Sequence, residues 1–195
     1  MTVAGLLLAG GRSTRFGTEK AVFPLAGGEL MMDTPLRALR AACAVAAVSA
    51  RPDSGAAAHA AKLGLPRLYD RPGDPEGPLA GIRAGLEWAA AQGAEGLATA
   101  PCDGLAIDAV GVRRLVAAFE GGGARAVIAC SPAGWEPLLA VWPVEDGLAL
   151  LERELAEGRH PSVRDLLASL GATPVDGYDG VNVNAPSDLP EPLRR

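Results

Sequence analysis

The first twenty residues place an apolar run directly before a glycine-rich, positively charged stretch. Residues 3–8 are entirely apolar, and a short apolar run bounded by glycine predicts a buried strand of a parallel sheet. In residues 9–20, glycines let the backbone approach a ligand closely, and successive backbone N–H groups can form an anion site. Arg12, Arg15 and Lys20 add donors for charge-assisted hydrogen bonds. The stretch therefore predicts a binding site for the phosphates of a nucleotide.

Two standard phosphate-binding motifs do not fit this stretch. Walker A has four residues between its glycines, whereas five separate Gly11 from Gly17, and two more precede Lys20. The Rossmann spacing Gly-x-Gly-x-x-Gly is also absent. As a bare pattern the stretch is equally compatible with a surface loop of solvated charges, because short glycine motifs recur by chance.

The rest of the chain alternates short apolar segments with helical patterns, which indicates an α/β fold with a largely parallel sheet. Without an internal repeat or a linker, residues 1–195 are expected to form a single domain. Further strands are expected at residues 44–50, 66–70, 96–100, 125–130 and 136–142. Helices are expected at residues 35–43, 53–63, 79–92, 108–119, 146–156 and 162–170. Asp33 or Thr34 is expected to cap the first of them, with Pro35 at its first position, and Asp53 and Asp108 are expected to cap the second and the fourth.

Polar side chains follow the expected strands at the edge where an open parallel sheet binds ligands. Asp70 and Asp103 each end a strand, and a carboxylate opposite a phosphate site suits Mg²⁺, which takes one or two carboxylates together with phosphates and waters. Asp103 could equally be a turn or capping residue, and residues 71–81 could be an ordinary connection. Asn182 and Asn184 point the same way on a strand, where they could bind metal or substrate or line a polar edge.

Composition narrows the class of protein. A net charge of −5 argues against general nucleic-acid binding, so the N-terminal cations point to a small anion. No segment reaches the roughly 20 apolar residues of a membrane span, and residues 3–8 are too short for a secretory leader. Three widely spaced cysteines, Cys43, Cys102 and Cys130, fit a reducing cytoplasm, and a zinc site is not expected. Cys102 is expected to pack, and His59 to lie on the surface.

Five blocks of the chain together resemble the molybdenum cofactor guanylyltransferases (MobA-type) of the nucleotidyltransferase superfamily. The first is Leu-Ala-Gly-Gly-x-x-x-Arg-φ-Gly-x-x-Lys over residues 8–20, which many nucleotidyltransferases share. The others are Gly-Pro-Leu-Ala-Gly at 77–81, Pro-Cys-Asp at 101–103, Glu-Pro-Leu-Leu-Ala-Val-Trp at 136–142 and Val-Asn-Val-Asn-Ala-Pro at 181–186. The set spans almost the whole chain and is much more specific than its first block.

The resemblance implies a Rossmann-like three-layer fold and Mg²⁺-dependent transfer of GMP from GTP to molybdopterin, with release of pyrophosphate. It implies catalytic roles for Lys20, Asp103 and Arg15, with Asp103 binding the metal. It also implies a nucleotide-binding set of Leu8, Ala9, Gly10, Gly11, Arg12, Lys20, Asp70 and Asp103, and a substrate-binding pair of Asn182 and Asn184. The implied partners are GTP, molybdopterin and proteins that insert or accept the molybdenum cofactor, with neither nucleic acid nor membrane.

The chain departs from the family pattern at several places. Glu19 stands where the family usually has Asp, and Trp135-Glu136-Pro137 replaces a Pro-His-Pro-like stretch, which leaves the contacts to the pterin open. Val48-Ser49 stands where the family has an asparagine, and Gly27-Gly28-Glu29 departs from a Gly-x-Pro-Leu loop.

Two other kinds of function stay open at this point. One is a related nucleotidyltransferase that uses CTP or a sugar phosphate acceptor, although glycine at position 10 favours guanine over cytosine by resemblance. The other is a nucleotide-binding protein without catalysis, which the presence of both Lys20 and Asp103 disfavours.

Overall fold

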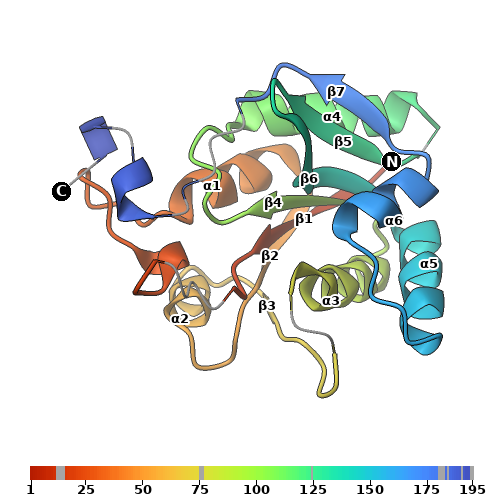
Figure 1. Cartoon of the computed structure of the whole chain (residues 1–195), viewed down its shortest axis with the longest axis horizontal. Coiled ribbons are helices and arrows are strands. Elements are labelled where there is room, and N and C mark those ends of the chain that lie inside the picture. Colours follow the sequence, from red (N-terminus) through yellow and green to blue (C-terminus); the bar gives the residue numbers. More distant parts are fainter. Residues whose placement is uncertain are drawn as a thin grey trace.

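A seven-stranded, mostly parallel sheet forms the centre of the molecule (Figure 1). The computed structural model describes residues 1–11, 16–74, 77–123, 125–179, 183, 185–189 and 191–193. The strand order is β3-β2-β1-β4-β6-β5-β7, and β6 alone runs antiparallel to its neighbours. The expected α/β fold with a largely parallel sheet is confirmed. The strands are β1 (Val3–Leu8), β2 (Val45–Ser49), β3 (Arg67–Leu68), β4 (Gly96–Pro101), β5 (Val127–Ser131), β6 (Gly134–Pro143) and β7 (Thr173–Asp176).

Helices cover both faces of the sheet and complete the three layers. One face packs against α1, α2 and α4, and the other against α3, α5 and α6 (Figure 1). None of the helices in the described part of the chain is long and apolar enough to cross a membrane. The helices are α1 (Asp33–Ala42), α2 (Gly55–Lys62), α3 (Pro78–Ala91), α4 (Ala109–Gly121), α5 (Val144–Ala156) and α6 (Val163–Ser169), with 3₁₀ turns η1 (Lys20–Val22), η2 (Pro186–Asp188) and η3 (Glu191–Leu193).

Strand β1 separates two hydrophobic cores, because successive side chains of a strand point to opposite faces. Val3 and Leu7 belong to the core that includes α1 and α4, whereas Ala4 and Leu6 belong to the core that includes α3. All four are at most 4% exposed. A Cβ on Gly85 of α3 would collide with Leu6, so this glycine lets the helix lie close to the strand. The end of β1 is thereby held firmly between two layers of helices.

Some of the expected helix starts differ by a residue or two. Ser54, and not Asp53, caps α2 by accepting a backbone N–H of the first turn at 3.1 Å. Helix α1 already begins at Asp33, whose carboxylate accepts a backbone N–H of the preceding turn at 2.8 Å, so Pro35 is its third residue. Neighbouring polar residues compete for one capping position, and the backbone of the loop decides between them. Asp108 caps α4 as predicted.

Strand β7 was not predicted from the sequence. Its four residues are mostly exposed and lack an apolar alternation, and parallel pairing with β5 is what makes them a strand. The strand extends the sheet at its far edge, on the opposite side from β3.

The C-terminal segment packs against the loop that precedes α1. Val183 and Leu189 form a small third core with Phe16 and Met31, and all four are at most 5% exposed. Of the strand expected around Asn182 and Asn184, the structure describes Val183 between them, and both asparagines lie outside the described residues.

Candidate active site

The chain leaves β1 in a turn at the carboxyl edge of the sheet. Leu8 ends the strand, and Ala9 is buried and donates its N–H to the Ser49 carbonyl at 2.8 Å. Gly10 is half-buried and Gly11 exposed, and a Cβ on either would meet no atom of the described residues within 4 Å. The described part of the chain therefore leaves space beside these two glycines. A ligand can approach the backbone here, as the glycine pattern predicts.

Lys20 and Asp103 meet beside this turn, although they lie 83 positions apart. The Lys20 ammonium donates to Asp103 Oδ2 at 2.8 Å, and each side chain is only 15% exposed. The ammonium also lies 5.8 Å from the centre of the Phe16 ring, within the range of a cation–π contact. Lys20 comes from η1 and Asp103 from the turn after β4, which pairs with β1. The structure thus brings together the cation predicted for phosphate and the carboxylate predicted for metal.

Glu19, next to Lys20, binds the start of α2. Its two carboxylate oxygens accept the backbone N–H groups of Gly55 at 2.7 Å and Ala56 at 2.8 Å. The first N–H groups of a helix have no partner within the helix, and the helix dipole favours a negative charge there. The acid that departs from the family pattern is therefore part of the scaffold that carries Lys20.

Asp70 lies apart from this pair. It follows β3, which is three strands away from β4, or about 14 Å at the usual spacing between strands. Desolvation raises the pKa of Asp70, the neighbouring Asp74 carboxylate raises it further, and Arg83 opposes both effects. Arg83 forms an ion pair with Asp74, which ties the loop after β3 to α3. The structure thus places Asp70 at the same edge of the sheet but not in contact range of Asp103.

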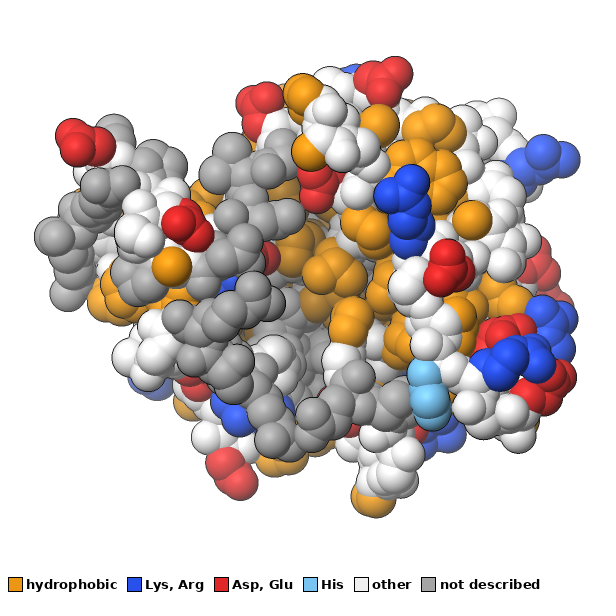
Figure 2. Space-filling view, in the orientation of Figure 1, with side chains coloured by type: hydrophobic (Ala, Val, Ile, Leu, Met, Phe, Trp, Pro, Cys, Tyr) orange, Lys and Arg blue, Asp and Glu red, His pale blue; other side chains and the backbone are white. Residues whose placement is uncertain are grey.

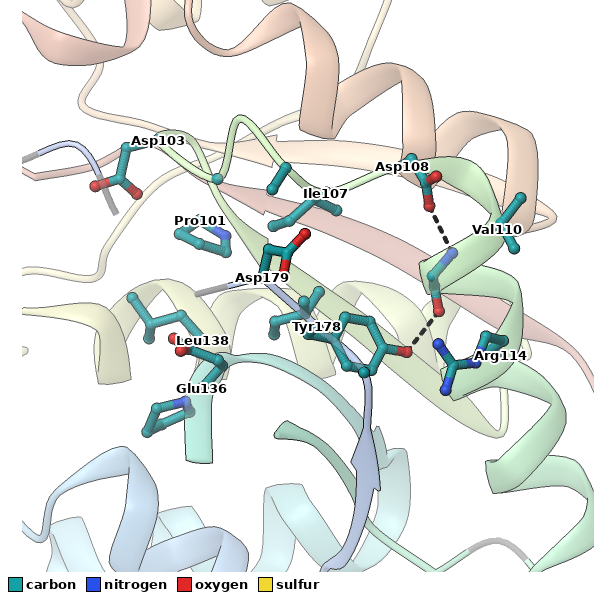
Figure 3. A pocket seen from close by; sticks show the side chains of 16 residues that line it. Pro101, Asp103, Ile107, Asp108, Val110, Arg114, Glu136, Leu138, Tyr178 and Asp179 are labelled. Carbon is teal, nitrogen blue, oxygen red and sulfur yellow. Dashed lines mark hydrogen bonds between the residues drawn. The ribbon is translucent and has the colours of Figure 1, made fainter. Parts of the chain in front are cut away.

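A cavity of about 500 Å³ opens on the other side of Asp103. Figure 2 shows hydrophobic side chains gathered near the middle of the face that Figure 1 presents. In Figure 3, Asp103 lies on one side of the cavity and Arg114 on the other, with Ile107, Asp179 and Tyr178 between them and Leu138 beside Glu136. Glu136, Asp179 and Asp108 also line the cavity, so its walls combine apolar side chains with carboxylates.

Tyr178 and Arg114, which the sequence did not single out, shape one wall of this cavity. The Tyr178 hydroxyl donates to the Gly111 carbonyl at 2.7 Å (Figure 3). The Arg114 guanidinium lies 5.4 Å from the centre of the Tyr178 ring and donates to the Asp176 carbonyl at 2.6 Å. Burial raises the pKa of Tyr178 to about 12, and the nearby Arg114 opposes this rise. This wall depends on the position of β7. Because the sequence did not predict β7, it did not predict these two residues as part of the site either.

Glu136 lies in the cavity wall at the place where the chain departs from the family pattern. Ser131 Oγ donates to Glu136 Oε1 at 2.7 Å, across the turn between β5 and β6. The neighbouring Trp135 ring stacks under the Arg164 guanidinium, 5.2 Å from its centre. The stretch that departs from the family pattern, for which the sequence does not predict the contacts to the pterin, therefore borders the cavity.

The remaining titratable residues near the site offer no nucleophile. Burial, reinforced by the Asp103 carboxylate, raises the pKa of Cys102 to about 12, which suits the expected packing role. His59 is not simply on the surface, because its Nε2 lies 2.8 Å from Asp33 Oδ1 and its side chain is 22% exposed. Among the described residues, no group of three or more His, Cys, Asp or Glu could hold a metal.

Four of the predicted site residues lie outside the described part of the chain. They are Arg12, Arg15, Asn182 and Asn184.

Comparisons with known proteins agree over most of the chain. The sequence model of the "MobA-like NTP transferase domain" matches residues 5–173. A molybdenum cofactor guanylyltransferase of Rhodobacter capsulatus is 45% identical over 119 residues, which is 60% of each chain. One of Cereibacter sphaeroides is 38% identical over 195 residues, covering 97% of this chain and 94% of that one.

Solved structures share the fold. Molybdopterin-guanine dinucleotide biosynthesis protein A of Archaeoglobus fulgidus superposes with a TM-score of 0.73 at 21% identity, covering 95% of this chain and 94% of that one. At this identity the likeness shows the fold alone, whereas the family's sequence model matches from within β1 to the first residue of β7. The chain therefore belongs to the family of MobA-like nucleotidyltransferases.

Proposed function

We propose that this enzyme transfers GMP from GTP to molybdopterin and releases pyrophosphate. Relatives named molybdenum cofactor guanylyltransferase match the chain from end to end. The observation that carries the proposal is the Lys20–Asp103 pair, which stands between an open glycine turn and a cavity. The turn suits the nucleotide and the cavity suits the acceptor. We further propose that residues 1–195 act as one domain and that the enzyme works in the cytoplasm, where its three free cysteines stay reduced.

The chemistry of the site fits a Mg²⁺ ion that arrives with the nucleotide. Asp103 supplies a carboxylate at the sheet edge, and Mg²⁺ in nucleotide sites takes one or two carboxylates and completes its shell with phosphate oxygens and waters. The remaining ligands of such an ion would come from the nucleotide and from water, since no group of three or more His, Cys, Asp or Glu among the described residues could hold a metal. When bound, the ion would supply charge to the phosphates at Asp103, and Lys20 would be released from its ion pair to bind phosphate.

The nucleophile in this reaction is a terminal phosphate oxygen of the acceptor, which attacks the α-phosphorus of GTP in line. This oxygen is already anionic, so the protein needs no general base. Catalysis is then mainly positioning and stabilisation of charge on the departing pyrophosphate. We assign that stabilisation to Lys20, together with Arg12 and Arg15. Leu8 to Gly11 hold the nucleotide through their backbone, and Asp70 contacts its guanosine part.

We assign the cavity beside Asp103 to the acceptor. Its volume of about 500 Å³ falls within the usual range for small-molecule sites, roughly 300–1,000 Å³. Apolar side chains of its lining such as Ile107 and Leu138 suit the flat ring system of a pterin, and Asn182 and Asn184 are assigned to the substrate. Proteins that insert or accept the finished cofactor are the expected macromolecular partners.

A pyrophosphate-release assay tests this function. GTP and CTP would each be supplied with molybdopterin or with a sugar phosphate, at several Mg²⁺ concentrations. We expect release with GTP and molybdopterin together, and little with either alone. A preference for CTP would favour a cytidylyltransferase, release with the sugar phosphate would point to the other acceptor class, and nucleotide binding without release would indicate a non-catalytic protein.

A further inference from the structure

The segment that carries Lys20 is fastened to the fold through the residue before it. Both oxygens of Glu19 are used on the first two N–H groups of α2, at 2.7 and 2.8 Å. Hydrogen bonds from backbone N–H groups to a carboxylate are stronger than those between neutral groups, and here the helix dipole adds to them. Glu19 therefore holds η1 against α2 as a two-point clamp.

Helix α2 and η1 are closely packed beside the Glu19 clamp. A Cβ on Gly55 would lie 2.8 Å from Val22 Cγ2 and 3.2 Å from Glu19 Oε2. On the other side of Lys20, the Ala21 carbonyl accepts the N–H of Met32 at 3.0 Å. The backbone of Lys20 is thus fixed on both sides.

Helix α2 is itself a rigid anchor. Ala56 and Ala60 are fully buried in the core on that face of the sheet. His59 contacts Asp33 at the start of α1, with 2.8 Å between Nε2 and Oδ1. Since α2 is held by both the core and α1, any segment clamped to it shares its position relative to the sheet.

We propose that Glu19 is a positioning residue that sets the place of the Lys20 ammonium relative to Asp103 and to the phosphates that bind there. The inference rests on the proposed function, because it gives Lys20 its role. Glu19 contacts neither the nucleotide nor the acceptor in this proposal. It acts through the chain segment that joins the clamp to Lys20, and a shift of about 1 Å in a positioned group can cost as much as a hundredfold in rate.

The test is a double-substitution cycle with Glu19→Gln and Lys20→Ala, measured on the full chain as pyrophosphate release from GTP and molybdopterin. Gln keeps the size of the side chain but turns one accepting oxygen into a donor, so one of the two bonds is lost. We expect Glu19→Gln to lower kcat about tenfold when Lys20 is present. We expect it to change kcat by less than twofold in the Lys20→Ala background, because there is no ammonium left to misplace. Glu29→Gln is the matched control, since Glu29 is an exposed carboxylate of the same segment that pairs with Arg37.

The outcomes separate this inference from the function on which it rests. A loss of kcat by the same factor in both backgrounds would show that Glu19 acts independently of Lys20. An unchanged kcat in the Glu19→Gln protein, even with a lowered melting temperature, would reduce Glu19 to a structural role. If Lys20→Ala itself leaves kcat unchanged, the assignment of the site under the proposed function is wrong as well.

A second variant approaches the clamp from the helix. Gly55→Ala keeps Glu19 but brings a Cβ to 2.8 Å from Val22 Cγ2, so the contact between α2 and η1 must shift, while the higher helix propensity of alanine offsets part of the cost to folding. Its kcat should fall in the Lys20 protein and not in the Lys20→Ala protein. Equal losses in both would overturn the proposal even if Glu19→Gln fails to fold.

Discussion

The two sides of Asp103 are built in different ways. On the side that we assign to the nucleotide, β2, β1 and β4 run parallel, and the site consists of a glycine-rich stretch, one lysine and one glutamate close together in the sequence. On the cavity side, β6 runs antiparallel between β4 and β5, and the walls come from the start of α4, from β6 and from the segment after β7. One site is local in the sequence, and the other exists only after folding.

This difference shows what each side can do. A backbone turn with fixed cations suits phosphates, which all nucleotides share, and it tolerates little change in position. A cavity lined by both apolar and charged side chains suits a particular acceptor, and its walls can vary without moving the phosphate site. Asp103 belongs to both, because it pairs with Lys20 and also lines the cavity.

Asp103→Asn should have the largest effect, because it damages both sides at once. Asparagine keeps the size of the side chain but removes the charge that balances Lys20 and that we assign to the metal. We expect product formation to fall about a hundredfold or more, the scale for one strong electrostatic contact. Turnover and thermal unfolding should be compared with those of Asp108→Asn, which changes another aspartate of the cavity into an equally good helix cap. Near-normal turnover of the Asp103 variant at saturating Mg²⁺ would exclude the metal-binding role.

Lys20→Ala should damage the nucleotide side selectively. Loss of a hydrogen-bonding charge at the phosphates is expected to cost roughly ten- to a hundredfold in kcat/KM for GTP. The KM for the acceptor should change little, because Lys20 does not line the cavity. Arg67→Ala, at the exposed first position of β3, is the control and should behave like the unaltered enzyme. Similar kinetics of the two variants would contradict the phosphate assignment.

Leu138→Trp should damage the cavity side selectively. Leu138 is a partly buried residue of the cavity wall, and the larger indole would occupy part of the volume of about 500 Å³. We expect the KM for molybdopterin to rise about tenfold, or ~1.4 kcal/mol, with the affinity for GTP unchanged. Leu63→Trp, at a leucine that is 40% exposed at the end of α2 and does not line the cavity, is the control. A loss of GTP affinity with unchanged acceptor KM would mean that the nucleotide uses this cavity.

The same contrast explains what the sequence could predict of the fold. The buried strands β1, β4 and β6 carry continuous apolar runs, and their order with the helices indicates a parallel α/β sheet. Strand β7 carries no such signal, since it is an exposed edge strand that depends on β5 for pairing. The antiparallel direction of β6 was not predicted either, although the connection to β5 is too short for a parallel pair, which needs a crossover of a dozen or more residues.

The candidate site divides in the same way. Lys20 and Asp103 could be named in advance, because a glycine turn and the end of a strand are marked in the sequence. Tyr178 and Arg114 could not, since they come together only through β7 and α4. The role of Glu19 was also hidden, because its partners are backbone groups 36 and 37 positions further along the chain.

Tyr178→Phe should have the smallest effect, and it tests whether the cavity wall is a structural feature separate from the chemistry. The substitution removes only the hydrogen bond to the Gly111 carbonyl, so the free energy of unfolding should fall by about 1 kcal/mol near pH 8, while kcat and the KM for GTP stay the same.

This difference in the free energy of unfolding between the two proteins should shrink in alkaline solution. The pKa of this hydroxyl is raised from its ordinary value of 10 to about 12 in the folded protein, so the folded state holds the proton more tightly than the unfolded state. That part of the stability is complete below pH 10 and is lost as the pH rises towards 12, and the Phe variant has no such proton to lose. Unfolding measured at pH 8 and pH 11 should therefore show a smaller difference between the two proteins at pH 11. Tyr69, which is exposed in both proteins, cancels in the comparison. A difference that stays constant or grows with pH would show that the hydroxyl is not held as a buried donor, and a fall in kcat would show that the wall is not separate from the chemistry at Asp103.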